Sequence, residues 1–76
     1  MSAPLSLLDQ IIAISELSPI FARGAITRAL RRAGIVPEEV TRSSARMALP
    51  EIRRAVEPFL QGRTDAIMRK LELLLE

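Results

Sequence analysis

The chain has 76 residues, 49% of them hydrophobic, and it carries a formal net charge of +2 without a single Cys or His. This composition excludes disulfides, thiolate or imidazole metal sites and the commonest catalytic nucleophile–base pairs. A core this small cannot enclose so large an apolar share, so we expect one helical domain over residues 1–76 that is completed by self-association.

The first ten residues, MSAPLSLLDQ, have no basic region ahead of their apolar residues and place Asp9 among them. A secretory signal has the opposite arrangement. No apolar run approaches the roughly 20 residues that span a bilayer. We therefore expect a cytoplasmic protein without a membrane span.

Helical periodicity predicts an all-α fold, a compact bundle of four to five short helices. Strand-like alternation of apolar and polar residues is missing from the sequence, and β-branched residues are sparse. Four of the five prolines stand where a helix can begin, because proline suits the first turn. The expected helices cover residues 4–17, 19–34, 37–48, 50–61 and 63–75.

The first of these segments has apolar residues on more than one side, which indicates a helix buried on more than one side. The second segment is amphipathic. Its apolar half contains Ala22, Ala25, Ile26, Ala29, Leu30 and Ala33. Ser18 is expected to cap its start, and Gly34 to end it in a left-handed conformation. Gly24 inside the helix suggests a close approach by another helix.

The opposite half of the second segment is basic, and residues 20–36 contain no acid. This basic face consists of Arg23, Arg28, Arg31 and Arg32. The simplest interpretation is a solvated helix face. Alternatives are contact with an acidic protein or with the acidic first segment of this chain, then binding of a phosphate backbone. A membrane surface ranks last, because the opposite face is mostly alanine.

Residues 30–46 carry part of a helix-turn-helix pattern. Gly34 and Val40 have the expected spacing, but Leu30 stands where that motif prefers Ala. The recognition helix would be 37–48, with the readers Arg42, Ser43 and Arg46. Its first turn would aim Glu38 and Glu39 at a polyanion, so an ordinary corner between two helices is favoured.

The next two segments are predicted to end and start near residues 48–50, because their apolar stripes point in different directions and Pro50 stands between them. Pro58 should bend or tighten the last turn of the segment it occupies. The final segment is apolar enough to need a second surface. We expect a partner-binding apolar surface made of Phe59, Leu60, Ile67, Leu71, Leu74 and Leu75.

Catalytic chemistry has little support in this sequence. Ser43 and Ser44 have no His to activate them, and the glutamates at 38 and 39 point in different directions. Thr64 and Asp65 indicate a helix cap, and the three glycines form no phosphate-binding loop. We therefore expect no enzyme activity, no metal, no cofactor and no small-molecule substrate.

The sequence thus predicts a non-enzymatic helical protein-interaction or scaffolding module that forms homo-oligomers or binds another protein. The alternative is a nucleic-acid-associated protein that holds the phosphate backbone through the arginine-rich helix face.

Overall fold

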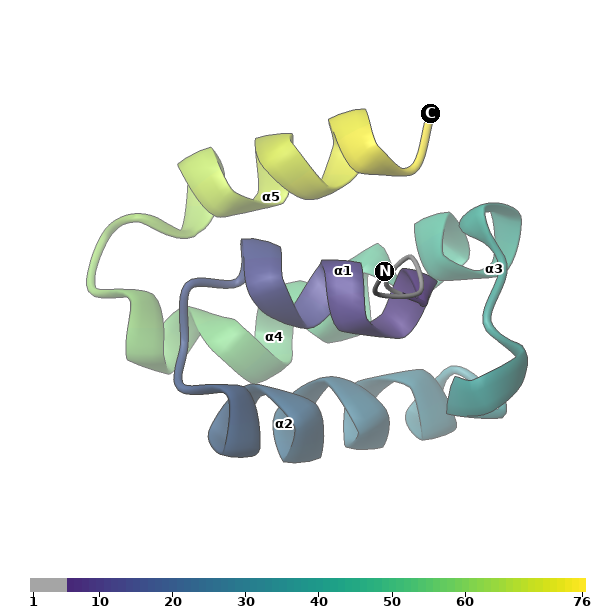
Figure 1. The fold of residues 1–76 in the computed structure, drawn as a ribbon. Helices are drawn as coiled ribbons and strands as arrows, with labels where there is room; N and C mark the ends of the chain where they lie inside the picture. Colours follow the sequence, from purple (N-terminus) through teal and green to yellow (C-terminus); the bar gives the residue numbers. More distant parts are fainter. Residues whose placement is uncertain (1–5) are drawn as a thin grey trace, which may run out of the picture.

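Five α-helices and one short 3₁₀ turn make up residues 6–76, the part of the chain that the computed structural model describes (Figure 1). The elements are α1 (Leu7–Ile14), α2 (Pro19–Arg32), η1 (Pro37–Glu39), α3 (Arg42–Met47), α4 (Leu49–Leu60) and α5 (Thr64–Leu74). These residues contain no strand, so the predicted all-α class is confirmed. The predicted start of the first helix at residue 4 lies outside the described residues.

The two ends of α2 follow the local signals in the sequence. Ser18 caps the helix through its side-chain oxygen, which accepts a hydrogen bond from the Phe21 backbone N–H at 3.4 Å, and Pro19 occupies the first turn. Beyond the last turn, Gly34 adopts a φ of 81°, a conformation that glycine enters without strain. Both predicted ends are confirmed.

The predicted helix over residues 37–48 is wrong. Pro37–Glu39 form only a 3₁₀ turn, and the backbone is then extended at Val40 and Thr41. The reason is a reciprocal cap. Ser44 N–H donates to the Thr41 hydroxyl at 3.1 Å, and Thr41 N–H donates to the Ser44 hydroxyl at 2.9 Å. This pair starts a new helix at Arg42, one turn later than the proline suggested.

The predicted break before the fourth segment is confirmed. Ala48 ends α3 and also begins α4, and Pro50 stands in the first turn of α4. Pro58 lies in the last turn of α4 without ending the helix, which continues to Leu60. Gln61 then reverses the chain in a left-handed conformation with a φ of 49°.

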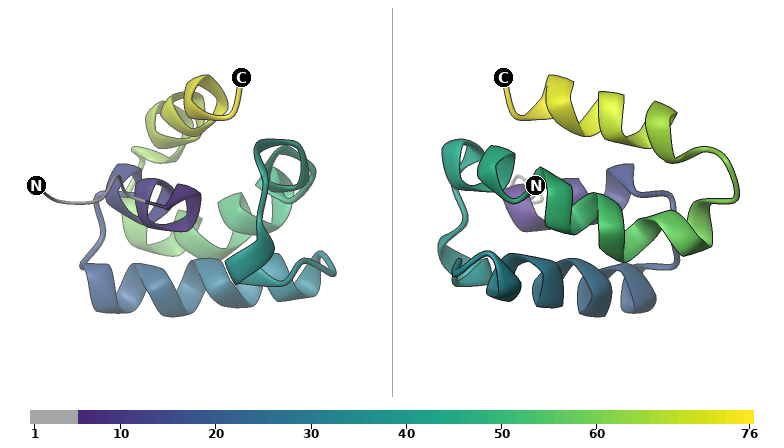
Figure 2. Two further views of the ribbon diagram at one scale, coloured as in Figure 1. Left: turned by 45° about the vertical axis from the view of Figure 1, so that its right-hand side comes forward. Right: turned by 180° about the vertical axis from the view of Figure 1, so that it is seen from behind.

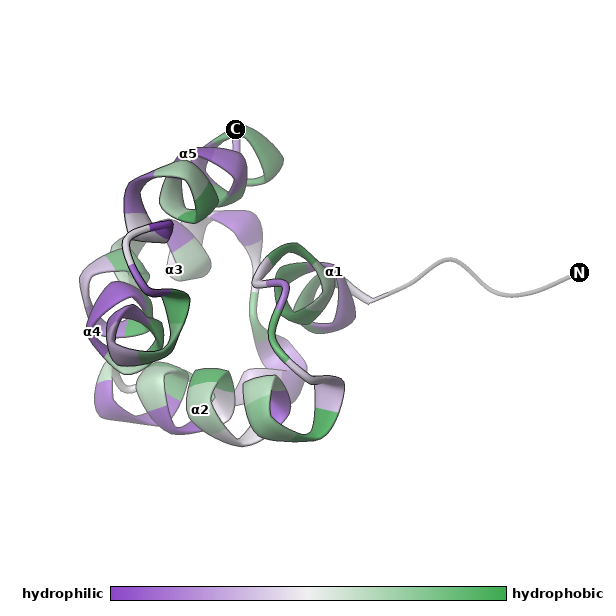
Figure 3. Ribbon diagram, turned by 90° about the vertical axis from the view of Figure 1, so that its left-hand side faces the viewer, coloured by the Kyte–Doolittle hydropathy of each residue, from purple (hydrophilic) through white to green (hydrophobic). Residues whose placement is uncertain are grey.

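The core lies where α1, α2, α4 and α5 surround a common centre (Figures 2 and 3). The pairing of α2 with α4 is the most extensive, because the predicted alanine-rich face of α2 lets the two backbones approach closely. The buried cluster comprises Ile11, Ile12, Ala22, Ile26, Ala29, Leu30, Ala45, Ala48, Ile52, Val56, Leu60, Ile67, Met68, Leu71 and Leu75. Of the apolar stripe predicted on α2, only Ala33 is exposed.

The helices α2 and α5 lie on opposite sides of the molecule, with α1 and α4 between them (Figure 1), and this holds in each turned view (Figure 2). The outer faces of α2 and α5 therefore point in different directions.

No helix within residues 6–76 has both the length and the apolar content needed to cross a bilayer.

Candidate partner-binding face

The apolar surface predicted from the sequence is largely used inside this chain. Four of its six residues are buried in the core: Leu60, Ile67, Leu71 and Leu75. Leu74 is half-buried and packs against the same core, and Phe59 alone is exposed. Periodicity shows which side chains share a helix face, whereas the element that covers the face is decided by tertiary packing. Here α5 covers α4 and α1.

The large apolar side chains that remain exposed are Ile20, Phe21, Val36, Met47, Phe59 and Leu73. Phe21 from the first turn of α2 meets Phe59 from the last turn of α4. Their ring centroids are 4.4 Å apart with an interplanar angle of 71°, an edge-to-face arrangement. Both phenylalanines remain partly exposed, at 39% and 48%, and Ile20, which precedes Phe21 in the chain, is exposed at 90%.

Two arginines complete this surface. Phe21, Ala25, Arg28, Arg32, Ala55 and Phe59 line a hollow of about 170 Å³ between α2 and α4. Arg28 and Arg32 are one helical turn apart, so their side chains leave the same side of α2. We call the set Phe21, Arg28, Arg32 and Phe59 the aromatic–arginine face. It offers apolar area and bidentate donors for carboxylates at one place.

The four predicted basic residues do not share one environment. Arg23 donates to Asp9 at 2.6 Å, and this hydrogen bond lowers the pKa of the Asp9 carboxyl. Contact between the basic face and the acidic first segment is therefore confirmed for Arg23. Arg28, Arg31 and Arg32 form no ion pair with any residue between 6 and 76. All three residues are exposed.

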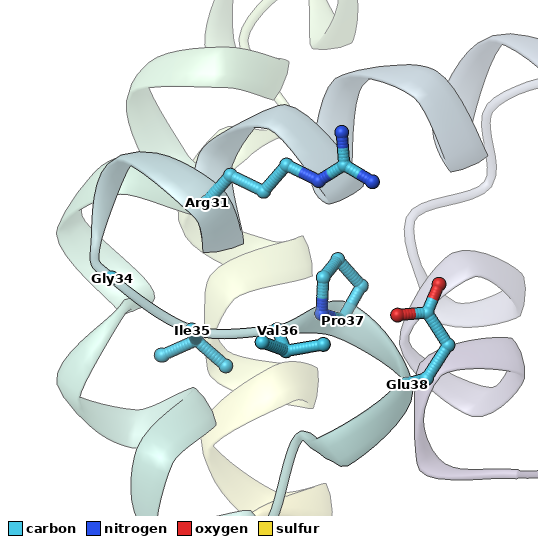
Figure 4. A pocket seen from close by; sticks show the side chains of 6 residues that line it. All are labelled: Arg31, Gly34, Ile35, Val36, Pro37 and Glu38. Atoms are coloured by element: carbon cyan, nitrogen blue, oxygen red, sulfur yellow. The ribbon is translucent and has the colours of Figure 1, made fainter.

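Arg31 borders a second hollow, of about 340 Å³, at the corner between α2 and η1. Figure 4 shows its guanidinium extended above Pro37, with the Glu38 carboxylate beyond the proline ring and Ile35 and Val36 along the connecting chain. Glu38 also lines the hollow next to Arg28. An acid therefore limits the basic surface on its η1 side.

The structure corrects the partial helix-turn-helix. Its second helix would have to run from Pro37 through Ala48, but the extended residues at 40 and 41 interrupt that path. Of the three proposed readers, Arg42 donates to the Glu76 backbone oxygen at 3.4 Å, and all lie on a helix of only six residues. Residues 30–46 therefore lack a recognition helix.

Two smaller expectations also fail. Gly24 is exposed, and an added Cβ would meet only the Arg28 side chain, at 4.0 Å, so no helix approaches it closely. The side chains of Thr64 and Asp65 do not cap α5: Thr64 is buried in its first turn, and Asp65 accepts a hydrogen bond from Arg53 at 2.8 Å. Both residues hold the start of α5 by packing and by charge.

Sequence reasoning missed Phe21. The signal was present, since Phe21 lies outside the alanine-rich stripe of its helix and follows Ile20, which puts two large apolar side chains on the polar side. Comparisons with protein-family models, with curated proteins and with solved structures gave no match to this chain.

Proposed function

We propose that this chain is a non-enzymatic protein-interaction module, and that the aromatic–arginine face binds an acidic, apolar helix of a protein partner. Phe21 and Phe59 supply the apolar contact, and Arg28 and Arg32 pair with carboxylates beside it. Apolar burial provides the attraction, while the charges select the partner.

The observation that carries the proposal is the position of the two phenylalanine rings. They are the only aromatic residues of the chain. Instead of filling the core, they meet at the surface, beside two guanidinium groups that have no acidic partner within residues 6–76. Aromatic and arginine side chains are enriched at the centres of protein–protein interfaces.

A binding titration followed by amide chemical shifts tests the proposal. The probe is a synthetic helical peptide with leucines on one side and glutamates on the other. We expect shifts centred on Phe21, Arg28, Arg32 and Phe59, and loss of binding in the Arg28→Glu/Arg32→Glu variant. The matched control, Arg46→Glu, changes an exposed arginine on α3 and should bind normally. A peptide with lysines in place of the glutamates should not bind, and its binding at the same residues would contradict the proposal.

Arg28, Arg31 and Arg32, which form no ion pair within residues 6–76, also favour a second candidate, binding of a nucleic-acid phosphate backbone without sequence preference. Three phosphate contacts predict a slope of about −2.7 for the logarithm of affinity against the logarithm of salt concentration on duplex DNA. The acidic Glu38 beside Arg31 and Arg28 opposes this use. Binding of random duplex DNA with that slope, together with no binding of the glutamate peptide, would favour the second candidate.

A further inference from the structure

We propose that the occupant of the aromatic–arginine face is the outer face of α5 on a second copy of this chain, so that copies associate head to tail. The proposal rests on the proposed function and names its partner.

The outer face of α5 carries the matching chemistry. Leu73 is exposed at 62%, although its neighbours in the sequence help to build the core. Glu72 and Glu76 are exposed next to it, and neither forms an ion pair within residues 6–76. We call Glu72, Leu73 and Glu76 the leucine–acid face. Arg69 is exposed three and four positions before Glu72 and Leu73, on the same side of α5, so one positive charge borders this face.

The two faces complement one another in charge and in apolar content. Within residues 6–76, two guanidiniums that form no ion pair stand beside two exposed rings on one face, and two carboxylates that form no ion pair stand beside an exposed leucine on the other. The Arg42 guanidinium contacts Glu76 only at its backbone oxygen, at 3.4 Å. Besides the two arginines, the hollow of about 170 Å³ on the aromatic–arginine face is lined by two phenylalanines and two alanines, so its lining is largely apolar. A branched aliphatic side chain such as that of Leu73 is therefore a suitable occupant, with Arg28 and Arg32 placed to pair with the flanking acids.

The positions of the two faces decide the kind of assembly. The aromatic–arginine face lies between α2 and α4, whereas the leucine–acid face lies on α5, on the other side of the molecule from α2 (Figure 1), so we expect a copy to turn its two faces toward different neighbours. The contact is heterologous, and each added copy leaves one face of each type free at the ends. A twofold pairing of two aromatic–arginine faces is disfavoured, because it would bring four guanidiniums together without a carboxylate from either face.

Sedimentation equilibrium over a concentration series tests this geometry. We expect the average mass of the wild-type chain to rise continuously with concentration and not to stop at two copies. Arg28→Glu/Arg32→Glu removes one face and Leu73→Glu removes the other. The association constant of each variant alone should therefore be lower than that of the wild-type chain by about tenfold or more. Circular dichroism checks that these variants of exposed side chains remain helical.

Mixing the two variants gives the sharpest result. The first variant keeps an intact leucine–acid face and the second keeps an intact aromatic–arginine face, so an equimolar mixture should form a one-to-one dimer that grows no further. Arg46→Glu and Met47→Glu are the matched controls, because both residues are exposed and belong to neither face. Both controls should associate like the wild-type chain.

Each outcome has a clear meaning. A wild-type chain that stays monomeric at all concentrations, or a mixture that forms no dimer, overturns the head-to-tail contact. If the wild-type chain is monomeric and still binds the glutamate peptide at Phe21 and Phe59, the partner is a different acidic protein, and only the proposed function survives. If it binds neither, both proposals fail.

Discussion

Glu16 and Lys70 are 54 positions apart in the sequence and meet at 2.9 Å, carboxylate oxygen to ammonium nitrogen. The second oxygen of Glu16 lies 3.0 Å from an Arg63 guanidinium nitrogen. Glu16, in the turn after α1, thus pairs with two cations: Arg63, directly before the first residue of α5, and Lys70, within α5. Glu16 does so from a left-handed backbone conformation, with a φ of 62°.

These contacts make stability depend on pH at its acidic end. The hydrogen bond and charge of Lys70 lower the pKa of Glu16 from its ordinary value of 4.5, and Arg23 lowers that of Asp9 from 3.8. A carboxyl group whose pKa is lower in the folded state than in the unfolded state stabilises the fold at pH values above the unfolded pKa. This stabilisation is lost as the pH falls through the folded pKa. We expect the melting temperature to be nearly flat from pH 7 to about 5 and to fall below about 4.5. The Glu16→Gln variant should show a shallower fall, and an unchanged pH profile would contradict this.

Replacing Gly24 or Gly34 with alanine should have opposite effects on the free energy of unfolding. Gly24→Ala is expected to stabilise the fold by about 0.5–1 kcal/mol, because Gly24 is helical, exposed and has room for a Cβ. Gly34→Ala is expected to destabilise it by about 1 kcal/mol, because alanine resists the φ of 81° even though the space is open. Urea unfolding curves measure both. A loss of stability in Gly24→Ala would reveal a neighbour that the structure does not place there.

Leucines in the last helix offer a direct contrast between core and surface. Leu71→Ala should lower the free energy of unfolding by about 2–5 kcal/mol, because Leu71 is 1% exposed and its removal leaves a cavity. Leu73→Ala should change it by less than about 0.5 kcal/mol, because this side chain is exposed. Thermal and urea denaturation of the dilute protein separate the two. Equal effects would mean that the two positions on α5 are assigned to the wrong faces.

The contact between Phe21 and Phe59 can be measured by a double-mutant cycle. Each single change to alanine removes the edge-to-face pair together with some buried ring area. The coupling energy between the two changes is expected to be about 0.5–1.5 kcal/mol. A coupling near zero would show that the rings contribute to stability independently, which would leave them free to separate around a partner side chain.

Local rules in the sequence were enough for the ends and the buried face of α2. Ser18, Gly34 and the alanine stripe each act within one helix, so their roles need no knowledge of the rest of the fold. The extended residues before α3 were within reach as well, since Thr41 and Ser44 have the spacing of a reciprocal cap. That spacing was not used for the prediction, because Pro37 indicated an earlier helix start.

The candidate site was harder to predict because it depends on two helices. Nothing near Phe21 in the sequence shows that the last turn of α4 brings Phe59 to within 4.4 Å of it. In the same way, the leucines at 71 and 75 look like a contact surface until the chain folds back and covers them. The expected surplus of apolar residues is consequently much smaller than composition alone suggests, and part of it gathers at the two rings.

The pairing of Arg23 with Asp9 has a consequence for the speed of association. Among residues 6–76, the arginines of α2 that form no ion pair are Arg28, Arg31 and Arg32, so the unneutralised charge of this helix lies in its second half. An acidic molecule begins to be oriented by this charge at a separation of about 10 Å in 0.1 M salt, before any side chains touch. For the proposed complex, added salt should therefore slow the encounter with the partner more than it shortens the lifetime of the complex, which would depend on contacts of the two rings.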